Sequence, residues 1–296
     1  MNDVKNVVDE MARANPNGGD YTGEDGLLYC GLCRSPKEAY FDASYAALFG
    51  RDRHPINCTC QQKRIEEMRI AELQRKHENT VKELKKDCFD TPKQQEWCFE
   101  NDNGANPQME YAHLYADHFD EFLHKNIGYL FWGDVGTGKS FSAACIANAL
   151  MAKEIPVRMT NFAAVLNDLS DSFEGRNAYI ARLCSYPLLI LDDFGMERNT
   201  EYALEQVYNV IDSRYRSGMP LIVTTNLSTD ELKYPQDMPH ARIYDRLLEM
   251  CTPVLFNGPN IRQQTAQNNL DIHYAKASGD DFLMPFCLQG QLSQGE

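Results

Sequence analysis

Short apolar runs alternate with stretches of helical periodicity over the second half of the chain. In residues 162–173, for example, Phe162, Val165, Leu166 and Leu169 recur at helical spacing. Strands that alternate with helices predict a parallel sheet with crossover helices, which is an α/β fold. The predicted strands are 127–132, 156–160, 187–191, 220–226 and 253–256. The predicted helices between them are 141–150, 162–173, 201–216 and 241–248.

A long charged stretch precedes this pattern. Residues 61–86 contain no glycine or proline, and they predict one long amphipathic helix. Its lysines and arginines could contact nucleic acid, but interleaved glutamates favour a solvated or partner-binding face. Residues 101–107 are polar and rich in turn formers, which predicts a linker, and 109–124 predicts a helix before the first strand of the sheet. The helical stripe consists of Ile70, Leu73, His77, Val81 and Leu84.

Composition limits the classes of partner and compartment. The formal net charge is -14 and the pI about 5.0, so general binding to nucleic acid through overall charge is not expected. The first residues are polar and do not form a signal peptide, and no apolar run is long enough to span a membrane. We therefore expect a cytoplasmic protein whose 10 cysteines are reduced.

Four of those cysteines have the spacing of metal ligands. Cys30 and Cys33 form a CxxC pair, and Cys58 and Cys60 form a CxC pair. Two such pairs suit tetrahedral Zn²⁺, and a segment with so few large aliphatic residues needs a staple. His54 is a substitute ligand if one cysteine is not used. The alternative is four ordinary reduced cysteines, whereas a thioredoxin-type site would need a βαβ setting that the sequence lacks.

The first predicted strand runs into the pattern G-x-x-x-x-G-K-[ST]. Such a loop surrounds a polyphosphate with backbone N–H groups, and the following helix directs its positive end to the same place. Lys139 is expected to reach the β- and γ-phosphates, and Ser140 to bind Mg²⁺. The expected nucleotide-binding residues are Gly133, Asp134, Val135, Gly136, Thr137, Gly138, Lys139, Ser140 and Phe141.

Polar residues end two of the later strands. Asp192 and Asp193 follow four aliphatic residues in the Walker B arrangement, so we assign Asp192 to Mg²⁺ and Asp193 to activation of the attacking water. Glu197 is the reserve candidate for the base. Asn226 can hydrogen-bond the water or the γ-phosphate, although it could instead cap the next helix. Arg262 follows the last strand, where an ATPase places an arginine to offset phosphate charge, but it could also be a surface salt-bridge residue.

Together these motifs resemble the DnaC/IstB-like branch of AAA+ ATPases. The match rests on residues 133–140 and 188–195, on Thr224-Thr225-Asn226, and on Asp245-Arg246-Leu247. The resemblance implies an AAA+ P-loop domain that binds ATP and Mg²⁺, with Asn226 as sensor 1. It also implies that Arg246 is an arginine finger acting in trans, and that Arg262 is sensor 2.

The cysteine-bearing front and the long helix resemble the members that load replicative helicases. In that family the zinc-type module docks onto the replicative DNA helicase, the AAA+ face contacts single-stranded DNA, and subunits assemble into oligomers. The chain departs from the family pattern in two places. Asp193 stands where many AAA+ proteins have glutamate, and the short tail after Arg262 leaves no room for a full helical lid.

The sequence therefore predicts four parts and leaves several functions open. The parts are a zinc-binding module at 1–61, a helix and linker at 62–108, an AAA+ domain at 109–264 and a weakly ordered tail at 265–296. The expected function is that of a helicase loader that hydrolyses ATP. The alternatives are a transposition-helper ATPase of the same branch, a P-loop kinase, and an interaction module with an inactive ATP site.

Overall fold

The computed structural model describes residues 19–104, 106–171, 175–195, 200–235, 237–263, 266–267 and 270. The chain groups into two units, one up to Asn79 and one from Thr80 onward, which are described separately. Glu197 and nearly all of the expected tail at 265–296 lie outside the described residues. The four domain limits expected from the sequence stay predictions.

The first unit consists of two small antiparallel strand pairs, a short helix and the start of a long one. Strand β1 (Tyr21–Thr22) pairs with β2 (Leu28–Tyr29), and β3 (Glu38–Tyr40) pairs with β4 (Arg53–Pro55). Helix α2 (Ala43–Phe49) lies between β3 and β4 in sequence. Cys30 and Cys33 lie at the turn that follows β2, whereas Cys58 directly precedes α3 (Thr59–Cys88) and Cys60 lies in its first turn.

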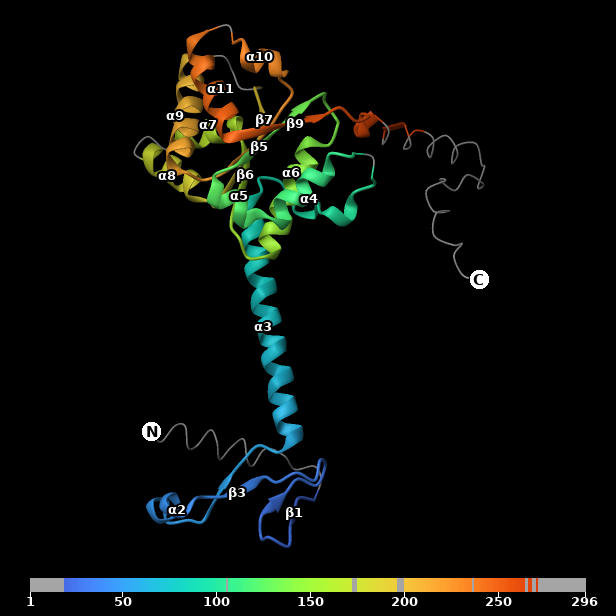
Figure 1. Cartoon of the computed structure of the whole chain (residues 1–296), viewed down its shortest axis with the longest axis vertical. Helices are drawn as coiled ribbons and strands as arrows, with labels where there is room; N and C mark the ends of the chain where they lie inside the picture. Colours follow the sequence, from blue (N-terminus) through green and yellow to red (C-terminus); the bar gives the residue numbers. More distant parts are fainter. Residues whose placement is uncertain are drawn as a thin grey trace, which may run out of the picture. The chain divides into compact units, whose positions relative to one another are not determined.

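The predicted long helix is α3 (Thr59–Cys88), which is continuous in Figure 1. Its side chains from 62 to 79 are exposed to solvent. Val81 and Leu84, at the other end of the predicted stripe, are partly buried, and Leu84 packs against the core of the second unit. The apolar stripe is thus used for core packing only in the last turns of the helix.

The second unit is built on a five-stranded parallel sheet with strand order β6-β7-β8-β5-β9. This finding confirms the predicted α/β fold. Because all strands are parallel, their carboxyl ends lie along one edge, where loops can bring side chains together. The strands are β5 (Gly128–Gly133), β6 (Val157–Asn161), β7 (Leu188–Phe194), β8 (Leu221–Thr225) and β9 (Cys251–Phe256).

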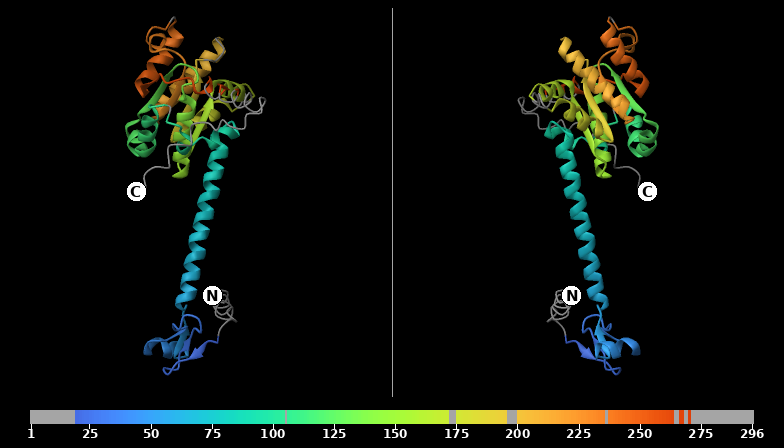
Figure 2. Two further views of the ribbon diagram at one scale, coloured as in Figure 1. Left: turned by 90° about the vertical axis from the view of Figure 1, so that its right-hand side faces the viewer. Right: turned by 90° about the vertical axis from the view of Figure 1, so that its left-hand side faces the viewer.

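Helices cover both faces of this sheet, as Figures 1 and 2 show. Short 3-10 turns η1 (Pro92–Glu96) and η2 (Phe99–Asn101) precede them. The helices are α4 (Met109–Asp117), α5 (Phe119–Lys125), α6 (Lys139–Ala152), α7 (Phe162–Asp171), α8 (Arg176–Ser185), α9 (Glu201–Ser217), α10 (Thr229–Lys233) and α11 (Met238–Met250).

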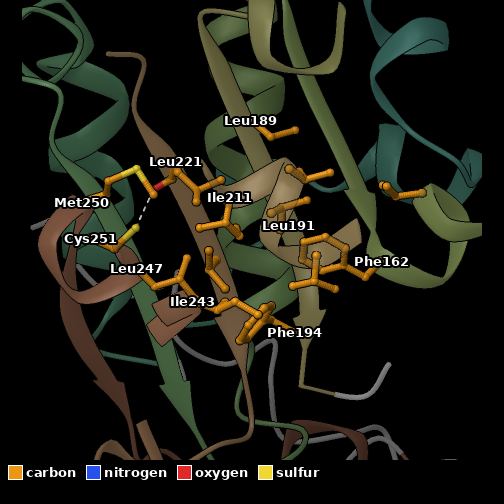
Figure 3. Close-up of a cluster of buried hydrophobic side chains, with 14 of the residues drawn as sticks. Phe162, Leu189, Leu191, Phe194, Ile211, Leu221, Ile243, Leu247, Met250 and Cys251 are labelled. Atoms are coloured by element: carbon orange, nitrogen blue, oxygen red, sulfur yellow. Dashed lines mark hydrogen bonds between the residues drawn. The ribbon is translucent and has the colours of Figure 1, made fainter. Parts of the chain in front are cut away.

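The alternation along β7 explains the two hydrophobic layers. Leu188 and Ile190 point into the layer beneath α4 and α6, whereas Leu189 and Leu191 point into the layer beneath α7, α9 and α11. Figure 3 shows the second layer, in which Leu191 lies among side chains from these helices. A strand that is buried on both faces is apolar throughout, and this is why 188–191 reads as a continuous aliphatic run.

One buried arginine joins the starts of two neighbouring strands. Arg214 of α9 is fully buried and donates to the carbonyls of Cys184, Tyr186 and Pro187 just before β7, at 2.8 to 3.3 Å. It also donates to the carbonyl of Pro220, just before β8, at 2.5 Å. Burial lowers the pKa of Arg214 to about 10. The guanidinium therefore links the backbone just before β7 to the backbone just before β8, and we call this set of hydrogen bonds the Arg214 clamp.

The helix expected at 109–124 is broken into α4 and α5. The backbone leaves helical geometry at His118 (φ -109°, ψ 27°), and this turn lets the rings of Tyr115 and Phe122 stack with centroids 4.6 Å apart. Packing against the core thus overrides the helical pattern. Among the described residues, no helix is both long and apolar enough to cross a membrane.

Candidate functional site

The phosphate-binding loop connects β5 to α6 and depends on glycines with left-handed backbone. Gly136 (φ 83°) and Gly138 (φ 97°) adopt conformations that disfavour other residues. A Cβ atom at Gly136 would lie 2.2 Å from Oδ1 of Asn260, and one at Gly138 would lie 3.0 Å from Nδ2 of Asn106. The loop is therefore closely packed against Asn106 and Asn260, and a side chain at either glycine would collide with them.

Lys139 is the first residue of α6 and lies in the loop. Its Nζ donates to the carbonyls of Gly133 and Asp134 at 2.7 Å each, and burial lowers its pKa. Thr137 closes the loop by donating from Oγ1 to the carbonyl of Asp134 at 2.8 Å. The ammonium is thus held at the centre of the loop, where phosphate oxygens can compete with these carbonyls for it.

The two predicted magnesium ligands lie together at the carboxyl end of β7. Burial raises the pKa of Asp192, while hydrogen bonds from Thr224 and Ser140 oppose that rise. The hydroxyl of Thr224 donates to Oδ1 of Asp192 at 2.6 Å and accepts from the backbone N–H of Asp193 at 2.9 Å. A partly buried carboxylate beside a serine hydroxyl is a suitable oxygen pair for Mg²⁺.

Asp193 and Asn226 also meet at this edge. Asp193 has a left-handed backbone (φ 59°), and the pairing of β7 with β8 shifts register between Leu191 and Phe194. This bulge re-aims the Asp193 side chain, whose Oδ1 accepts from Nδ2 of Asn226 at 3.2 Å. The residues predicted to activate and to orient the water are therefore adjacent.

These groups line one cavity of about 800 Å³. Arg262 belongs to its lining: burial lowers the pKa of Lys139 and the charge of Arg262 adds to this, whereas burial raises the pKa of Asp192 and the charge of Arg262 opposes it. The structure thus brings the predicted phosphate, magnesium and water residues together with Arg262. The sequence-predicted residues that line the cavity are Val135, Gly136, Gly138, Lys139, Ser140, Phe141, Asp192, Asp193, Asn226 and Arg262.

Arg246 lies elsewhere, on α11, and is not part of the described lining. Its Nη2 atom is 2.6 Å from Oδ1 of Asp212 on α9, and its guanidinium lies over the ring of Tyr208 at 4.7 Å. Asp212 also pairs with Arg216 at 2.7 Å. Arg246 is therefore held by contacts within its own chain. It does not line the cavity.

The far wall of the cavity is formed by residues that the sequence pattern does not indicate. Trp97 from the segment after η1 and Asn106 both line it, although this region reads as a polar linker. Asn106 is buried and donates from Nδ2 to the carbonyl of Thr137 at 2.9 Å, so it fixes the phosphate loop from outside. The sequence offers one indication of this wall, which is a tryptophan, Trp97, within a polar stretch. No sequence feature marks Asn106 as part of it.

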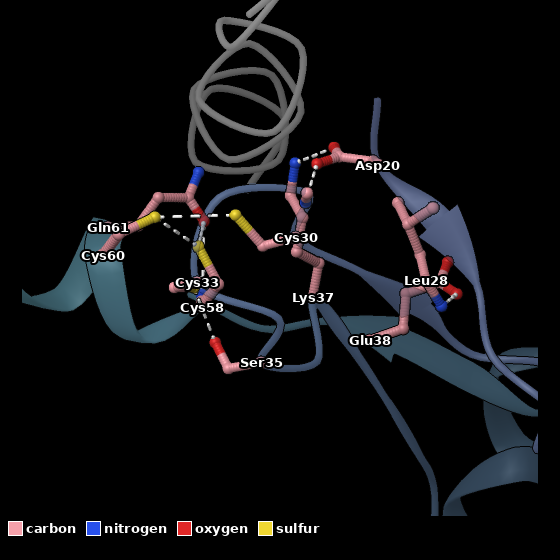
Figure 4. Close-up of polar contacts among 11 residues, drawn as sticks. Asp20, Leu28, Cys30, Cys33, Ser35, Lys37, Glu38, Cys58, Cys60 and Gln61 are labelled. Carbon is pink, nitrogen blue, oxygen red and sulfur yellow. Dashed lines mark hydrogen bonds and ion pairs between the residues drawn. The ribbon is translucent and has the colours of Figure 1, made fainter. Parts of the chain in front are cut away.

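The four predicted zinc ligands form a cluster in the first unit. Their sulfur atoms all lie within 4.8 Å of one another, with Cys58 and Cys60 at 3.3 Å and Cys30 and Cys60 at 3.6 Å (Figure 4). Four sulfurs around Zn²⁺ at about 2.3 Å are about 3.8 Å apart, so the cluster fits this ion. His54 instead packs against Phe41, with ring centroids 4.5 Å apart.

The electrostatics of the cluster also fit a cation. The hydroxyl of Ser35 lowers the pKa of Cys33 to about 5, whereas the thiols of Cys58 and Cys30 raise that of Cys60 to about 12. The four sulfurs therefore cannot all be thiolates at neutral pH unless a positive ion compensates them. Asp20 supports the first cysteine turn by accepting from the N–H of Gly31 at 3.1 Å.

The chain is similar to several curated proteins over part of its length. It is 28% identical over 150 residues to the replicative helicase loader DnaI of Bacillus subtilis, covering 47% of this chain and 48% of that protein. It is 29% identical over 163 residues to a putative ATP-binding protein in an insertion sequence of Mycobacterium tuberculosis, covering 53% and 64%. It is 25% identical over 166 residues to the replicative helicase loader DnaC of Escherichia coli, covering 54% and 65%. The chain thus spans about half to two thirds of these relatives.

The chain is also similar to solved structures of DnaI and DnaC. A crystal structure of DnaI is 22% identical with a TM-score of 0.49, covering 59% of this chain and 95% of that chain. A crystal structure of the DnaC helicase loader is 19% identical with a TM-score of 0.47, covering 56% and 100%.

The family comparison covers more than half of the chain. Residues 62–269 match the family described as IstB-like ATP binding protein. This range includes the phosphate loop, both carboxylates of β7, Asn226 and Arg262, but not the four-cysteine cluster. The match agrees with the resemblance that the motifs carry, and the chain belongs to the IstB-like ATP binding protein family.

Proposed function

We propose that this protein is an ATP-hydrolysing helicase loader that delivers a replicative DNA helicase onto single-stranded DNA. The observation that carries the proposal is one cavity lined by a phosphate loop, two carboxylates, Asn226 and Arg262, in a chain that also holds a four-cysteine cluster. The curated names of DnaI and DnaC support the loader function for relatives of the ATPase unit.

The residues of the cavity have distinct tasks in this proposal. The loop N–H groups and Lys139 bind the polyphosphate, while Ser140 and Asp192 hold Mg²⁺. Asp193 accepts a proton from the attacking water, and Asn226 orients that water. Arg262 offsets charge on the γ-phosphate. When bound, ATP with Mg²⁺ supplies the phosphoryl group that is transferred to water.

Assembly and docking complete the proposal. Arg246 would leave Asp212 and reach the nucleotide of a neighbouring subunit in an oligomer, so that hydrolysis depends on assembly. Zn²⁺ bound by Cys30, Cys33, Cys58 and Cys60 would hold the first unit in the shape that docks onto the helicase. The protein would act in the cytoplasm, and its ATPase unit would contact single-stranded DNA.

A transposition-helper ATPase is the second candidate. It is favoured by the insertion-sequence relative, whose identity of 29% is close to the 28% of DnaI. Such a protein would act with a transposase on duplex DNA. The four-cysteine cluster precedes the family match, so the match does not decide between the two partners. The match does favour both ATPases over a P-loop kinase.

Helicase delivery can be measured directly. The full-length protein is mixed with the replicative helicase of its source, ATP and a closed circle of single-stranded DNA, and unwinding of an annealed strand is followed. We expect stimulation by the wild type, none by Lys139→Ala, and normal stimulation by Lys125→Ala, which removes an exposed lysine from α5. Absence of helicase stimulation, together with ATP-dependent binding to duplex DNA and a transposase, would favour the second candidate.

A further inference from the structure

The first unit buries a lysine where a folded unit normally buries apolar side chains. Within the described part of this unit, residues 19–79, the buried side chains are those of Cys30, Lys37 and Cys58, and Lys37 is only 8% exposed. A lysine is almost never fully buried unless its charge is paired. The centre of the unit therefore consists of two predicted metal ligands and one ammonium group, and the proposed function gives the ammonium no task.

The backbone of Lys37 lies between the two segments that carry the cysteine pairs. Its N–H donates at 2.7 Å to the carbonyl of Leu28, two residues before Cys30. Its carbonyl accepts at 2.7 Å from the N–H of Ile56, two residues before Cys58. The lysine side chain therefore starts from the point at which the two cysteine-bearing segments are joined.

The ammonium of Lys37 is paired with a carboxylate that also supports the first cysteine turn. Its Nζ lies 2.5 Å from Oδ2 of Asp20, whose other oxygen accepts from the N–H of Gly31 at 3.1 Å (Figure 4). The hydrogen bond to Asp20 raises the pKa of Lys37, and burial opposes this rise. Negative charge on Cys30 and Cys58 raises the same pKa further. The ammonium is thus within electrostatic reach of two of the four sulfurs.

A bound zinc ion leaves the four-cysteine cluster with an excess of negative charge. Four thiolates carry four negative charges, and Zn²⁺ offsets two of them. The remaining charge lies in a small unit that holds a buried ammonium, and the attraction between the two stabilises the thiolate form of the ligands. Removing groups that support metal ligands in this way typically lowers metal affinity by about 10- to 100-fold.

We propose that Lys37 compensates the charge of the metal site and stabilises its thiolates in the zinc-bound state. Asp20 has a different task, which is to place both the ammonium and the turn at Gly31. The alternative is that Asp20 and Lys37 form only a structural ion pair between two segments. The proposal rests on the zinc site of the proposed function, and it is independent of ATP hydrolysis and of the helicase.

Cobalt(II) gives a direct measure of the metal site in the full-length protein. Co²⁺ takes the place of Zn²⁺ among thiolates, and its sulfur-to-metal charge-transfer absorption reports thiolate-bound metal. Titration with Co²⁺, followed by displacement with Zn²⁺, gives the affinity of each variant for both ions. We expect Lys37→Met, which removes the charge and keeps a long side chain, to bind both ions about 10- to 100-fold more weakly. Lys37→Arg keeps the charge and should retain most of the affinity.

Asp20→Asn separates charge compensation from a structural ion pair, because the two explanations predict different results. The amide oxygen of asparagine still accepts from the N–H of Gly31, while loss of the carboxylate leaves the Lys37 charge available to the thiolates. Charge compensation therefore predicts an affinity for Co²⁺ and Zn²⁺ equal to or above that of the wild type. A structural ion pair predicts the same loss of affinity in Asp20→Asn as in Lys37→Met.

Lys63→Met is the matched control for the loss of a positive charge. Lys63 is exposed on α3, three residues after Cys60, and is thus closer in sequence to a ligand than Lys37 is. We expect unchanged affinity for both ions. An equal loss in Lys63→Met and Lys37→Met would mean that the net charge of the unit decides, and it would overturn the specific task of the buried ammonium.

The same titrations distinguish failure of this proposal from failure of the zinc site. A wild-type protein that binds neither Co²⁺ nor Zn²⁺ through thiolates would overturn the zinc site, and the task of Lys37 with it. Binding by the wild type with unchanged affinity in Lys37→Met would overturn the task of Lys37 alone. The cobalt spectrum at saturation shows whether a variant still assembles the four sulfurs. If Lys37→Met does not, the direction of the change in Asp20→Asn decides.

Discussion

Asp193 occupies a costly backbone conformation for a residue with a side chain. A left-handed non-glycine residue costs on the order of 1–3 kcal/mol and persists only where surrounding contacts hold it. Here the hydroxyl of Thr224 accepts from its N–H, and the amide of Asn226 donates to its carboxylate. The bulge in β7 thus separates Asp193 from Asp192 and gives two adjacent acids different surroundings.

This separation predicts different defects for two variants. Asp193→Asn should retain ATP binding and lower turnover by about 10²–10⁴, because only the acceptance of the proton from water is removed. Lys139→Ala should weaken ATP binding itself, because the ammonium at the centre of the loop is lost. Equilibrium binding of a fluorescent ATP analogue and steady-state phosphate release distinguish the two. Normal turnover in Asp193→Asn, with loss in Glu197→Gln, would make Glu197 the base.

At the scale of elements, α9 and α11 are joined by a charge cluster. Asp212 forms ion pairs with Arg246 and Arg216, and Tyr208 and Tyr215 lie against the Arg246 guanidinium at 4.7 and 5.7 Å. If Arg246 leaves for a neighbouring subunit, Arg216 still neutralises Asp212. The exchange therefore does not leave a buried carboxylate unpaired, which would be costly.

Weakening this cluster should favour the assembled state. In Asp212→Asn, the Arg246 side chain loses its charged partner, so ATP hydrolysis should reach half of its maximum at a lower protein concentration than in the wild type. Arg216→Ala leaves the Asp212–Arg246 pair in place and serves as the control. Turnover measured over a range of protein concentrations tests this. An unchanged or higher half-maximal concentration in Asp212→Asn would contradict an intrachain restraint on Arg246.

The sequence predicted elements well where a local pattern and a motif coincide. Strands β5 and β7 were predicted because their apolar runs lead directly into polar motifs, the phosphate loop after β5 and Asp192-Asp193 near the end of β7. The far wall of the cavity, with Trp97 and Asn106, and helix α8 (Arg176–Ser185) were not predicted. The carbonyl of Trp97 accepts a hydrogen bond from Asn148, which lies 51 residues later in the chain, and no local pattern encodes such a contact. The pairing of Arg246 with Asp212 also depends on how α9 and α11 pack.

At the scale of the whole molecule, we expect the first unit to depend on a bound metal and the second unit to fold without one. The first unit contains strands of two or three residues and few buried apolar side chains, whereas the second has two hydrophobic layers. So small a unit requires a staple. The two units should therefore respond differently when the metal is removed.

The purified protein should contain about one Zn²⁺ per chain. Chelation, or Cys33→Ser, should unfold the first unit and leave ATP binding by the second intact. Cys145→Ser, in the buried face of α6, removes a thiol outside the cluster and should leave the zinc content unchanged. Elemental analysis and limited proteolysis report the two effects. Protein produced with zinc available that contains no metal would contradict the prediction.

Cooperation between subunits can be tested by mixing. Arg246→Ala should leave ATP binding by a single subunit nearly intact but suppress hydrolysis, since a fully engaged trans arginine contributes about 10³–10⁵ in rate. Mixing Arg246→Ala with Lys139→Ala subunits should restore turnover where an intact loop meets an intact arginine. If subunits shown to co-assemble regain no activity at any ratio, Arg246 acts within its own chain.

The clamp made by Arg214 has a consequence for how the sequence can vary in length. It fixes the starts of β7 and β8, while Thr224, Asp192, Asp193 and Asn226 contact one another at the other ends. Inserting or deleting one residue within 188–192 or 221–225 would change the distance between the two ends of the strand. The contacts of Arg214 at the start and the contacts of the polar residues at the end could then not form together. Insertions outside the two strands escape this constraint. Length variation among relatives should accordingly collect outside these strands and be absent from them.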